Sequence, residues 1–286
     1  MTTRVYISRD MMALALGAER VVRAFAGVPD VEIVRNGSRG LLWLEPMIEV
    51  DTPAGRIAYG PVRAEDVAGL LQAGMLQGGA HALRLGRPED MPYLARQQRL
   101  TFSRCGIVDP LSLEDYRAHG GLRGLDRALE IGPAAIVEAL RVSGLRGRGG
   151  AGFPTAIKWD TVRRAEADCK YVVCNADEGD SGTFADRLML EGDPFCLIEG
   201  MIIAAVATRA TQGYVYVRSE YPQAFDTFGR AIEVAYAAGL LGEAILGSPH
   251  RFDLQVRLGA GAYICGEETS MLESLEGRRG RSESVV

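Results

Sequence analysis

A glycine-rich loop with two arginines is the first candidate for chemistry in this sequence. Five of the nine residues from Gly144 to Gly152 are glycine, Arg146 and Arg148 lie among them, and Lys158 follows. Glycine lets the backbone approach a ligand closely, and successive N–H groups in such a loop can bind phosphate. The loop therefore predicts a phosphate-binding site, and a flexible connector is the alternative.

The loop formally matches the G-x-G-x-x-G pattern at Gly147, Gly149 and Gly152. A dinucleotide-binding fingerprint requires a strand before that pattern. The preceding segment, 134–144, has helical periodicity instead, and no GK[ST] sequence closes the loop. We therefore reject both an ordinary Rossmann site and a P-loop.

Polar side chains follow two apolar segments further along the chain. Asn175, Asp177, Glu178 and Asp180 come after KYVVC, and the sequence GEET at 266–269 comes after an apolar run. Each group could simply cap a helix, because acidic and amide side chains are favoured at helix N-termini. The functional alternative is hydrogen bonding to a polar ring or ribitol by the first group, and a carboxylate pair beside a redox ring by the second.

The elements around these loops predict an α/β fold. From residue 121 onward, apolar strand-like segments alternate with helical ones, which favours a mostly parallel sheet covered by helices. Such sheets bind ligands at the carboxyl ends of their strands. Both polar loops fall at such ends.

The N-terminal part has a different order of elements. A strand at 4–8, a helix at 11–26, a strand–turn–strand unit at 31–50 with Asn36-Gly37 as its turn, a further strand and a closing helix predict a thioredoxin-like domain. The expected domains are a thioredoxin-like domain at 1–76, a linker with little regular structure at 77–120, and an incomplete α/β domain at 121–286.

Composition excludes several classes of function. A net charge of -5 gives no general nucleic-acid surface. The apolar stretch 195–206 contains Glu199 and is too short to span a bilayer, so we expect a buried helix, no membrane insertion and a cytoplasmic location. The five cysteines form no C-x-x-C pair and the three histidines lie far apart, which predicts buried thiols and no metal site.

Three blocks of this sequence resemble one family. Segments 143–159, 170–187 and 259–279 are similar to the NADH-binding flavoprotein subunit of respiratory complex I. They also resemble the diaphorase subunits of NAD-reducing hydrogenases and NAD-dependent formate dehydrogenases. The resemblance covers about 105–279. It implies FMN and NADH stacked in one cavity of a fold unlike the ordinary Rossmann domain. It also implies hydride transfer from NADH to FMN and onward electron transfer to iron–sulfur clusters.

The resemblance also implies roles for particular residues. Glu268 is the candidate for a catalytic role, and Asp180 stands where the family often has Glu. Thr161 stands about where a second stacking aromatic would be expected. The implied cofactor-binding residues are Gly147, Arg148, Gly149, Gly150, Phe153, Lys158, Asn175, Asp177, Glu178, Asp180, Tyr263, Gly266, Glu267 and Glu268.

The N-terminal extension resembles the thioredoxin-like partner domain that carries a two-iron cluster in this family. Residues 1–75 contain no cysteine, so we expect no cluster there, because thiolates are the ligands. The fusion implies that the formate dehydrogenase beta subunit is the nearest relative. The implied partners are other subunits of a formate dehydrogenase or complex I-like assembly, including an iron–sulfur thioredoxin-like subunit.

The end of the sequence departs from the family. RSESVV at 281–286 has no family likeness, and the cysteines of the family's four-iron cluster are absent. We therefore expect a truncated or frame-shifted chain, or a fragment, that lacks part of the FMN pocket. The predicted function is an NADH:acceptor oxidoreductase (diaphorase) subunit. The alternatives are an inactive remnant acting as a binding or assembly module, and a nucleotide-binding regulator without a redox role.

Overall fold

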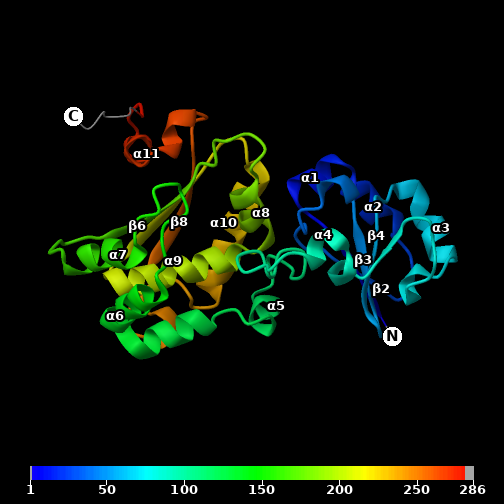
Figure 1. Cartoon of the computed structure of the whole chain (residues 1–286), viewed down its shortest axis with the longest axis horizontal. Coiled ribbons are helices and arrows are strands. Elements are labelled where there is room, and N and C mark those ends of the chain that lie inside the picture. Colours follow the sequence, from blue (N-terminus) through cyan, green and yellow to red (C-terminus); the bar gives the residue numbers. More distant parts are fainter. Residues whose placement is uncertain (1, 281–286) are drawn as a thin grey trace. The chain divides into compact units, whose positions relative to one another are not determined.

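A computed structural model describes residues 2–280, and the final segment RSESVV lies outside these described residues. The chain forms two compact units (Figure 1). Unit 1 contains Met1–Asp115 together with Glu191–Asp193. Unit 2 contains Tyr116–Leu190 and Pro194–Val286.

Unit 1 is built on a five-stranded mixed sheet with the order β2-β1-β3-β4-β5. β1 pairs in parallel with β2 and antiparallel with β3, and β3–β4 and β4–β5 are antiparallel. Its elements are β1 (Thr3–Ile7), α1 (Met11–Ala15), α2 (Ala18–Ala24), β2 (Val31–Val34), β3 (Ile48–Thr52), β4 (Gly55–Tyr59), α3 (Val67–Gln72), β5 (Arg84–Gly86) and α4 (Pro92–Ala95). Short 3₁₀ helices lie at Leu42–Leu44, Ala64–Asp66, Met75–Gln77 and Pro88–Asp90.

Two local predictions for unit 1 are wrong. The single helix expected at 11–26 is two helices, because Gly17 adopts a left-handed conformation with φ +106° between them. The strand–turn–strand unit expected at 31–50 is not a hairpin, since β1 lies between β2 and β3. Asn36 and Gly37 lack the positive φ of a type I′ turn. The Asn36 side chain instead donates to the carbonyl oxygen of Gly106 at 2.8 Å.

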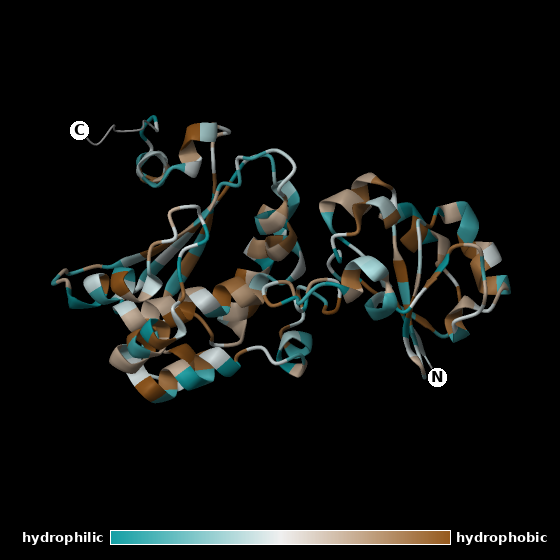
Figure 2. Ribbon diagram, viewed as in Figure 1, coloured by the Kyte–Doolittle hydropathy of each residue, from teal (hydrophilic) through white to brown (hydrophobic). Residues whose placement is uncertain are grey.

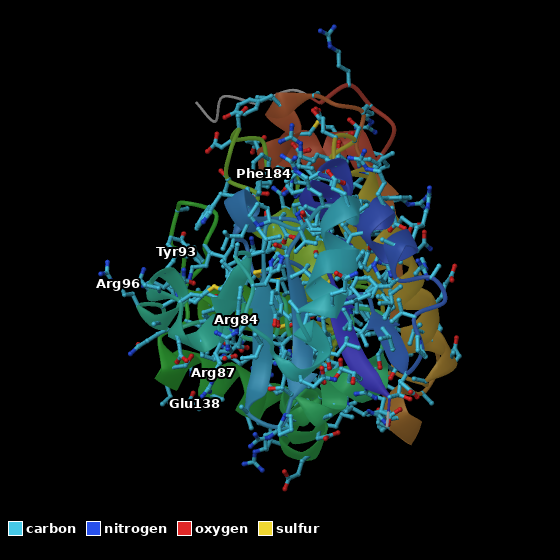
Figure 3. All side chains as sticks on the ribbon, turned by 90° about the vertical axis from the view of Figure 1, so that its right-hand side faces the viewer. Arg84, Arg87, Tyr93, Arg96, Glu138 and Phe184 are labelled. Carbon is cyan, nitrogen blue, oxygen red and sulfur yellow. The ribbon has the colours of Figure 1, made fainter. Side chains whose placement is uncertain are left out.

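The segment 77–120 is more regular than the sequence indicated. It contains β5, α4 and α5 (Leu113–Ala118), and β5 extends the sheet beside β4. A three-residue strand carries too little alternation to be recognised from its sequence. The exposed Arg96 of this segment extends away from the ribbon in Figure 3.

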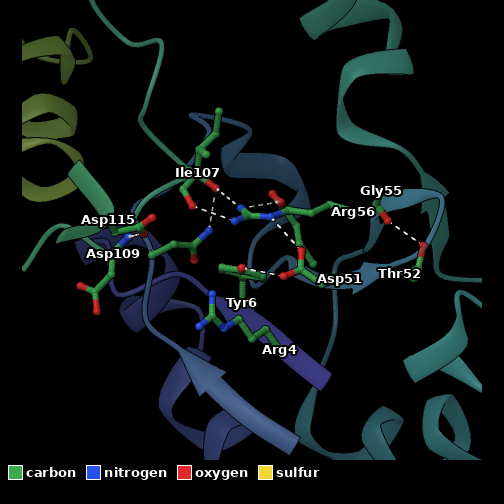
Figure 4. Close-up of polar contacts among 12 residues, drawn as sticks. Arg4, Tyr6, Asp51, Thr52, Gly55, Arg56, Ile107, Asp109 and Asp115 are labelled. Carbon is green, nitrogen blue, oxygen red and sulfur yellow. Dashed lines mark hydrogen bonds and ion pairs between the residues drawn. The ribbon is translucent and has the colours of Figure 1, made fainter. Parts of the chain in front are cut away.

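A buried charge network holds this segment against the sheet. Glu49 is only 2% exposed and accepts from Arg39 through both carboxylate oxygens, and Arg56 adds a contact at 3.5 Å. Arg56 also donates to the carbonyl oxygens of Gly106 and Ile107, at 3.3 and 2.9 Å (Figure 4). Three charged side chains therefore satisfy one another and two loop carbonyls where water is excluded.

Glu45 gives unit 1 a pH-dependent stability. Burial raises its pKa from 4.5 to about 7, and the nearby Asp10 and Glu49 charges add to the shift, against hydrogen bonds from Ser38 and Met47. A carboxyl whose pKa is raised by folding stabilises the protein below the unfolded pKa, and this stabilisation is lost as pH rises through 7. We expect wild-type unit 1 to lose up to about 3 kcal/mol between pH 4.5 and 8 through this group.

Glu45→Gln should lack that loss. Urea unfolding of both proteins at several pH values measures the free energy of unfolding. We expect similar values for the two proteins at pH 4.5 and a higher value for the variant at pH 8. Parallel pH profiles for the two proteins would contradict the assignment.

Unit 2 contains a three-stranded parallel sheet with the order β6-β7-β8. Tyr171 of β6 pairs with Gln212 of β7, which pairs with Asp253 of β8, so the first residues of the three strands are in register. The elements are α6 (Arg123–Ser143), α7 (Thr155–Arg164), β6 (Tyr171–Ala176), α8 (Ala185–Gly192), α9 (Pro194–Thr208), β7 (Gln212–Val217), α10 (Pro222–Ala237), β8 (Asp253–Leu258) and α11 (Glu268–Leu275). Short 3₁₀ helices lie at Ile245–Gly247 and Tyr263–Gly266.

Helices cover one face of this sheet. α9 and α10 pack against the strands, and hydrophobic residues, brown in Figure 2, run along α9. The buried helix predicted at 195–206 is confirmed. The opposite face carries a groove of about 620 Å³, lined by Tyr171, Tyr214 and Tyr216 among others, with α11 packed at one end. None of the helices within residues 2–280 is long and apolar enough to cross a membrane.

Glu199 of α9 anchors the start of α6, the helix that leads into the glycine-rich loop. It is 8% exposed, accepts at 2.9 Å from the N–H groups of Leu122 and Leu125, and accepts from the hydroxyl of Tyr116. A Cβ at Gly124 would lie 2.9 Å from its Oε1 atom, so the absence of a side chain there allows this approach. α6 ends at Gly144 in a left-handed conformation, as expected for a glycine C-cap.

Candidate functional site

The carboxyl ends of β6 and β8 bring the two polar loops into contact. Asn175 Nδ2 donates to the carbonyl oxygen of Gly266 at 2.8 Å. A Cβ at Gly266 would lie 3.3 Å from the main-chain oxygen of Asp177, which is tighter than an ordinary contact. Two segments 91 residues apart in sequence therefore form one surface, and glycine at 266 permits their close approach.

Two more contacts join predicted site residues. Tyr263 Oη donates to Asp180 Oδ1 at 3.0 Å, and the Tyr263 ring lies against Gly179, where a Cβ would be 2.8 Å from the ring. Lys158 Nζ of α7 lies 3.6 Å from Glu268 Oε2 at the start of α11. The structure thus brings Lys158, Asn175, Asp177, Asp180, Tyr263, Gly266 and Glu268 together at one edge of the sheet.

Glu178 and Glu267 have structural roles in this arrangement. Glu178 Oε1 accepts from the N–H groups of Ala185 and Asp186, at 2.7 and 3.0 Å, and so caps α8. Glu267 accepts from the N–H groups of Thr269 and Ser270, both at 3.0 Å, and caps α11. Those two hydrogen bonds hold the pKa of Glu267 below its usual value. The helix-cap alternative thus describes both carboxylates in this structure.

The glycine-rich loop is closed on itself and open to solvent. Gly147 N–H donates to the Phe153 carbonyl at 2.9 Å, and Arg146 Nη1 donates to the Gly152 carbonyl at 2.8 Å. A Cβ at Gly149 or Gly150 would meet nothing within 4 Å. Among residues 2–280, no hydrogen bond or ion pair engages the Arg148 side chain or joins Gly147, Gly149 or Gly150 to the two polar loops. The loop therefore places the charged Arg148 side chain, which has no partner among residues 2–280, beside glycines that leave space for a ligand.

Exposed aromatic rings flank the same region. Phe153 is 53% exposed and Tyr263 is 71% exposed, although rings of this size are usually half-buried or more. The groove on the sheet face is lined by other residues and by none of the predicted site residues. The candidate site is therefore an open surface at the strand ends rather than that groove.

Sequence patterns did not identify the residues at the end of the middle strand, β7. Arg218 Nη1 donates to the Glu178 carbonyl, and its Nε and Nη2 atoms hold the Glu220 carboxylate at 3.2 and 3.0 Å. Arg218 thereby lowers the pKa of Glu220 to about 2. Tyr221 Oη donates to Glu178 Oε2 at 3.0 Å. The rule that located the other loops, ligands at the carboxyl ends of parallel strands, also applies to 218–221.

Burial raises the pKa values of two further groups near this edge. It raises the pKa of Asp177 above the usual value, and the Arg218 charge opposes the shift. Burial and the Glu178 charge together raise the pKa of Tyr221 to about 12. No cluster of three Asp, Glu, His or Cys side chains in residues 2–280 could hold a metal ion.

These residues suit a flavin mononucleotide chemically. Arg148, Lys158 and the N–H groups of the glycine loop suit the phosphate. The amide of Asn175 suits the polar edge of a ring, and the exposed rings of Phe153 and Tyr263 suit stacking on a planar heterocycle.

Comparison with known proteins identifies the family. Residues 140–285, just over half of the chain, match the model of the Nuo51 FMN-binding domain. The NADP-reducing hydrogenase subunit HndC of Solidesulfovibrio fructosivorans is 51% identical over 185 residues, which are 65% of this chain and 38% of that protein. The mitochondrial NADH dehydrogenase [ubiquinone] flavoprotein 1 of Dictyostelium discoideum is 45% identical over 210 aligned residues, covering 63% of this chain and 43% of its own.

Two comparisons extend over nearly the whole chain. The NAD-reducing hydrogenase HoxS subunit alpha of Cupriavidus necator is 35% identical over 292 aligned residues, covering 97% of this chain and 47% of that protein. A crystal structure of an NAD+-reducing [NiFe]-hydrogenase in the H2-reduced state is similar with a TM-score of 0.53 and 29% identity, covering 98% of this chain and 47% of that one. The chain thus spans less than half the length of these relatives. The three sequence blocks, the joined strand-end loops and the family match lead to one conclusion: the chain belongs to the Nuo51 FMN-binding domain family.

Proposed function

We propose that this chain is the NADH-oxidising, FMN-binding (diaphorase) part of an oxidoreductase. The observation that carries the proposal is the meeting of the β6 and β8 loops, with Lys158 of α7, at the carboxyl edge of the parallel sheet. This is the edge at which open α/β sheets bind their ligands. The membership of the Nuo51 FMN-binding domain family supports FMN as the ligand.

Each group at the site has a proposed role. Arg148, Lys158 and the N–H groups of Gly147, Gly149 and Gly150 hold the FMN phosphate, because cations and backbone donors bind phosphate strongly. Asn175 and Asp177 hydrogen-bond the polar edge of the flavin. When bound, FMN accepts a hydride from NADH and releases electrons singly.

The remaining residues orient the nicotinamide cofactor. Phe153 and Tyr263 offer rings for stacking, and Asp180 holds Tyr263 in place through a 3.0 Å hydrogen bond. Glu268, which is exposed beside Lys158, is the candidate for a contact to the reacting cofactors. Glu178 and Glu267 support the site by fixing the starts of α8 and α11.

The proposed partners are the other subunits of an NAD-linked assembly, including an iron–sulfur protein that removes electrons. The alignment with the HoxS alpha subunit includes unit 1, so a fused N-terminal unit occurs in a hydrogenase relative. We also propose, more specifically, a formate dehydrogenase beta-type subunit. That proposal rests on the same fused N-terminal unit, which is compatible with a hydrogenase as well as with a formate dehydrogenase. Co-purification with a hydrogenase or a formate dehydrogenase catalytic subunit would distinguish them.

A visible absorption spectrum tests the proposal directly. The purified chain is incubated with FMN, desalted and then treated with NADH. A retained flavin spectrum that bleaches with NADH supports flavin binding and hydride transfer. A colourless protein would instead favour the inactive remnant, which keeps the fold without the chemistry.

Arg148→Ala should weaken FMN binding about tenfold, because one charge-assisted contact to phosphate is lost. Arg148 makes no side-chain hydrogen bond or ion pair within residues 2–280, so the fold should be unaffected. Quenching of flavin fluorescence measures the dissociation constant. Arg230→Ala on α10, where Arg230 lies 3.9 Å from Asp226, is the control. Equal affinities for both variants and wild type would remove Arg148 from the phosphate site.

A further inference from the structure

We propose that Arg218, at the carboxyl end of β7, is a positioning residue that fixes the orientation of the Glu178–Gly179 peptide in the flavin site. This inference rests on the proposed function for its ligand and on the structure for its geometry. Arg218 stands at the end of the middle strand, and the two polar loops follow the neighbouring strands. Its side chain can therefore reach the loop that follows β6.

The guanidinium of Arg218 is itself held by the side chains of Glu220 and Tyr221. Glu220 accepts from it through both carboxylate oxygens, at 3.2 and 3.0 Å, and the group lies 5.0 Å from the centroid of the Tyr221 ring. Only 18% of the Arg218 side chain is exposed. A planar guanidinium fixed in this way presents its remaining N–H groups in fixed directions. One of them, on Nη1, donates to the Glu178 carbonyl.

Glu178 is thus held at both its main chain and its side chain. Its carboxylate accepts from the N–H groups of Ala185 and Asp186 and from the Tyr221 hydroxyl. With the carbonyl bound to Arg218, the residue cannot rotate without breaking contacts both to the segment after β7 and to α8. The large number of donors on one glutamate indicates that the loop is preorganised before any ligand arrives.

Locking this carbonyl also sets the direction of the next N–H group. In a trans peptide the C=O and N–H bonds point in opposite directions, so the Gly179 N–H points away from Arg218. Within residues 2–280 that N–H group makes no hydrogen bond. Gly179 packs against the Tyr263 ring, and Tyr263 in turn bonds Asp180. Arg218 therefore aims a free backbone donor along the surface that we assign to the flavin.

Three variants test this role. Arg218→Met removes the donor while keeping the length of the side chain, Arg218→Lys keeps one cationic donor, and Arg257→Met on the adjacent strand β8 is the matched control. Arg257 is exposed and its guanidinium bonds Gln255, outside the site. Two readouts are taken: FMN affinity by fluorescence quenching, and amide hydrogen exchange at Ala185 and Asp186 in the chain without FMN.

We expect Arg218→Met to weaken FMN binding about tenfold and to speed exchange at Ala185 and Asp186 by a similar factor. Arg218→Lys should recover most of both effects, and Arg257→Met should change neither. Unchanged affinity and exchange in Arg218→Met would overturn the proposal. Faster exchange throughout the β6–β8 sheet would also overturn it, because Arg218 would then support the fold as a whole. If wild type itself binds no FMN, the proposed function fails, and the exchange data alone decide whether Arg218 positions the loop.

Discussion

Replacing Glu199 with alanine should lower the free energy of unfolding of unit 2 by about 3–5 kcal/mol. The carboxylate is 8% exposed and satisfies two backbone N–H groups and a buried hydroxyl. Alanine would deprive the N–H groups of Leu122 and Leu125 and the hydroxyl of Tyr116 of this buried acceptor. Each unsatisfied buried donor costs about 1–3 kcal/mol, which sets the size of the expected effect.

Urea unfolding followed by circular dichroism measures the loss, and two further variants give it a scale. Tyr116→Phe removes one of the three donors and should cost about 1 kcal/mol. Glu138→Ala breaks an exposed ion pair with Arg141 on α6 and should change stability by less than about 1 kcal/mol. If Glu199→Ala were no more destabilising than Glu138→Ala, the anchor at the start of α6 would have no energetic importance.

Replacing Glu49 with alanine should destabilise unit 1 by a similar amount, about 3–5 kcal/mol. The change removes the carboxylate that binds Arg39, and Arg39 is just 6% exposed. A buried guanidinium without its partner bears the full cost of leaving water. Arg56 would also lose its contact with Glu49 while still serving the Gly106 and Ile107 carbonyls (Figure 4).

Amide hydrogen exchange of β3 and β4 is the measurement, because it reports on unit 1 by itself. Glu32→Ala, which breaks the exposed pair with Arg4, is the matched control and should slow or speed exchange very little. Glu49→Gln should fall between wild type and alanine, since an amide oxygen still accepts from Arg39. Equal protection in Glu32→Ala and Glu49→Ala would show that the buried network adds nothing to stability.

The sequence predicted much of unit 2 because its signals are local. Alternating apolar strands and helices identified β6, β7, β8, α9 and α10, and the strand-end rule placed both polar loops correctly at one edge. Asn175 and Gly266 are hydrogen-bonded at that edge. Hydrophobic periodicity and strand order are properties of short segments, so a single sequence contains them.

Contacts between segments that are distant in sequence could not be predicted from the sequence. The dipeptide Asn36-Gly37 is typical of a hairpin turn, but β1 takes the place between β2 and β3, and only the assembled sheet decides this. The capping roles of Glu178 and Glu267 likewise depend on which N–H groups lie nearby after folding. Arg218 carries no motif of its own; its importance comes from a carbonyl 40 residues away.

The candidate site was predicted mainly through resemblance rather than spacing. A flexible connector remained the alternative for the glycine-rich loop. Within residues 2–280 the fold adds an Arg148 without a side-chain partner and open space at Gly149 and Gly150, which suit a ligand. Lys158 and Glu268 are far apart in sequence, and only the folded chain places their side chains 3.6 Å from one another. Their joint role stays a prediction.

The division into two units has a spectroscopic consequence. The chain has two tryptophans, Trp43 in unit 1 and Trp159 in unit 2. Trp43 is 59% exposed and meets the ring of Tyr93 edge-on at 5.2 Å, whereas Trp159 directly follows Lys158 on α7. Each unit thus contains its own single indole fluorophore. Emission from a Trp43→Phe protein would report only on the unit with the candidate flavin site, and emission from Trp159→Phe only on the other.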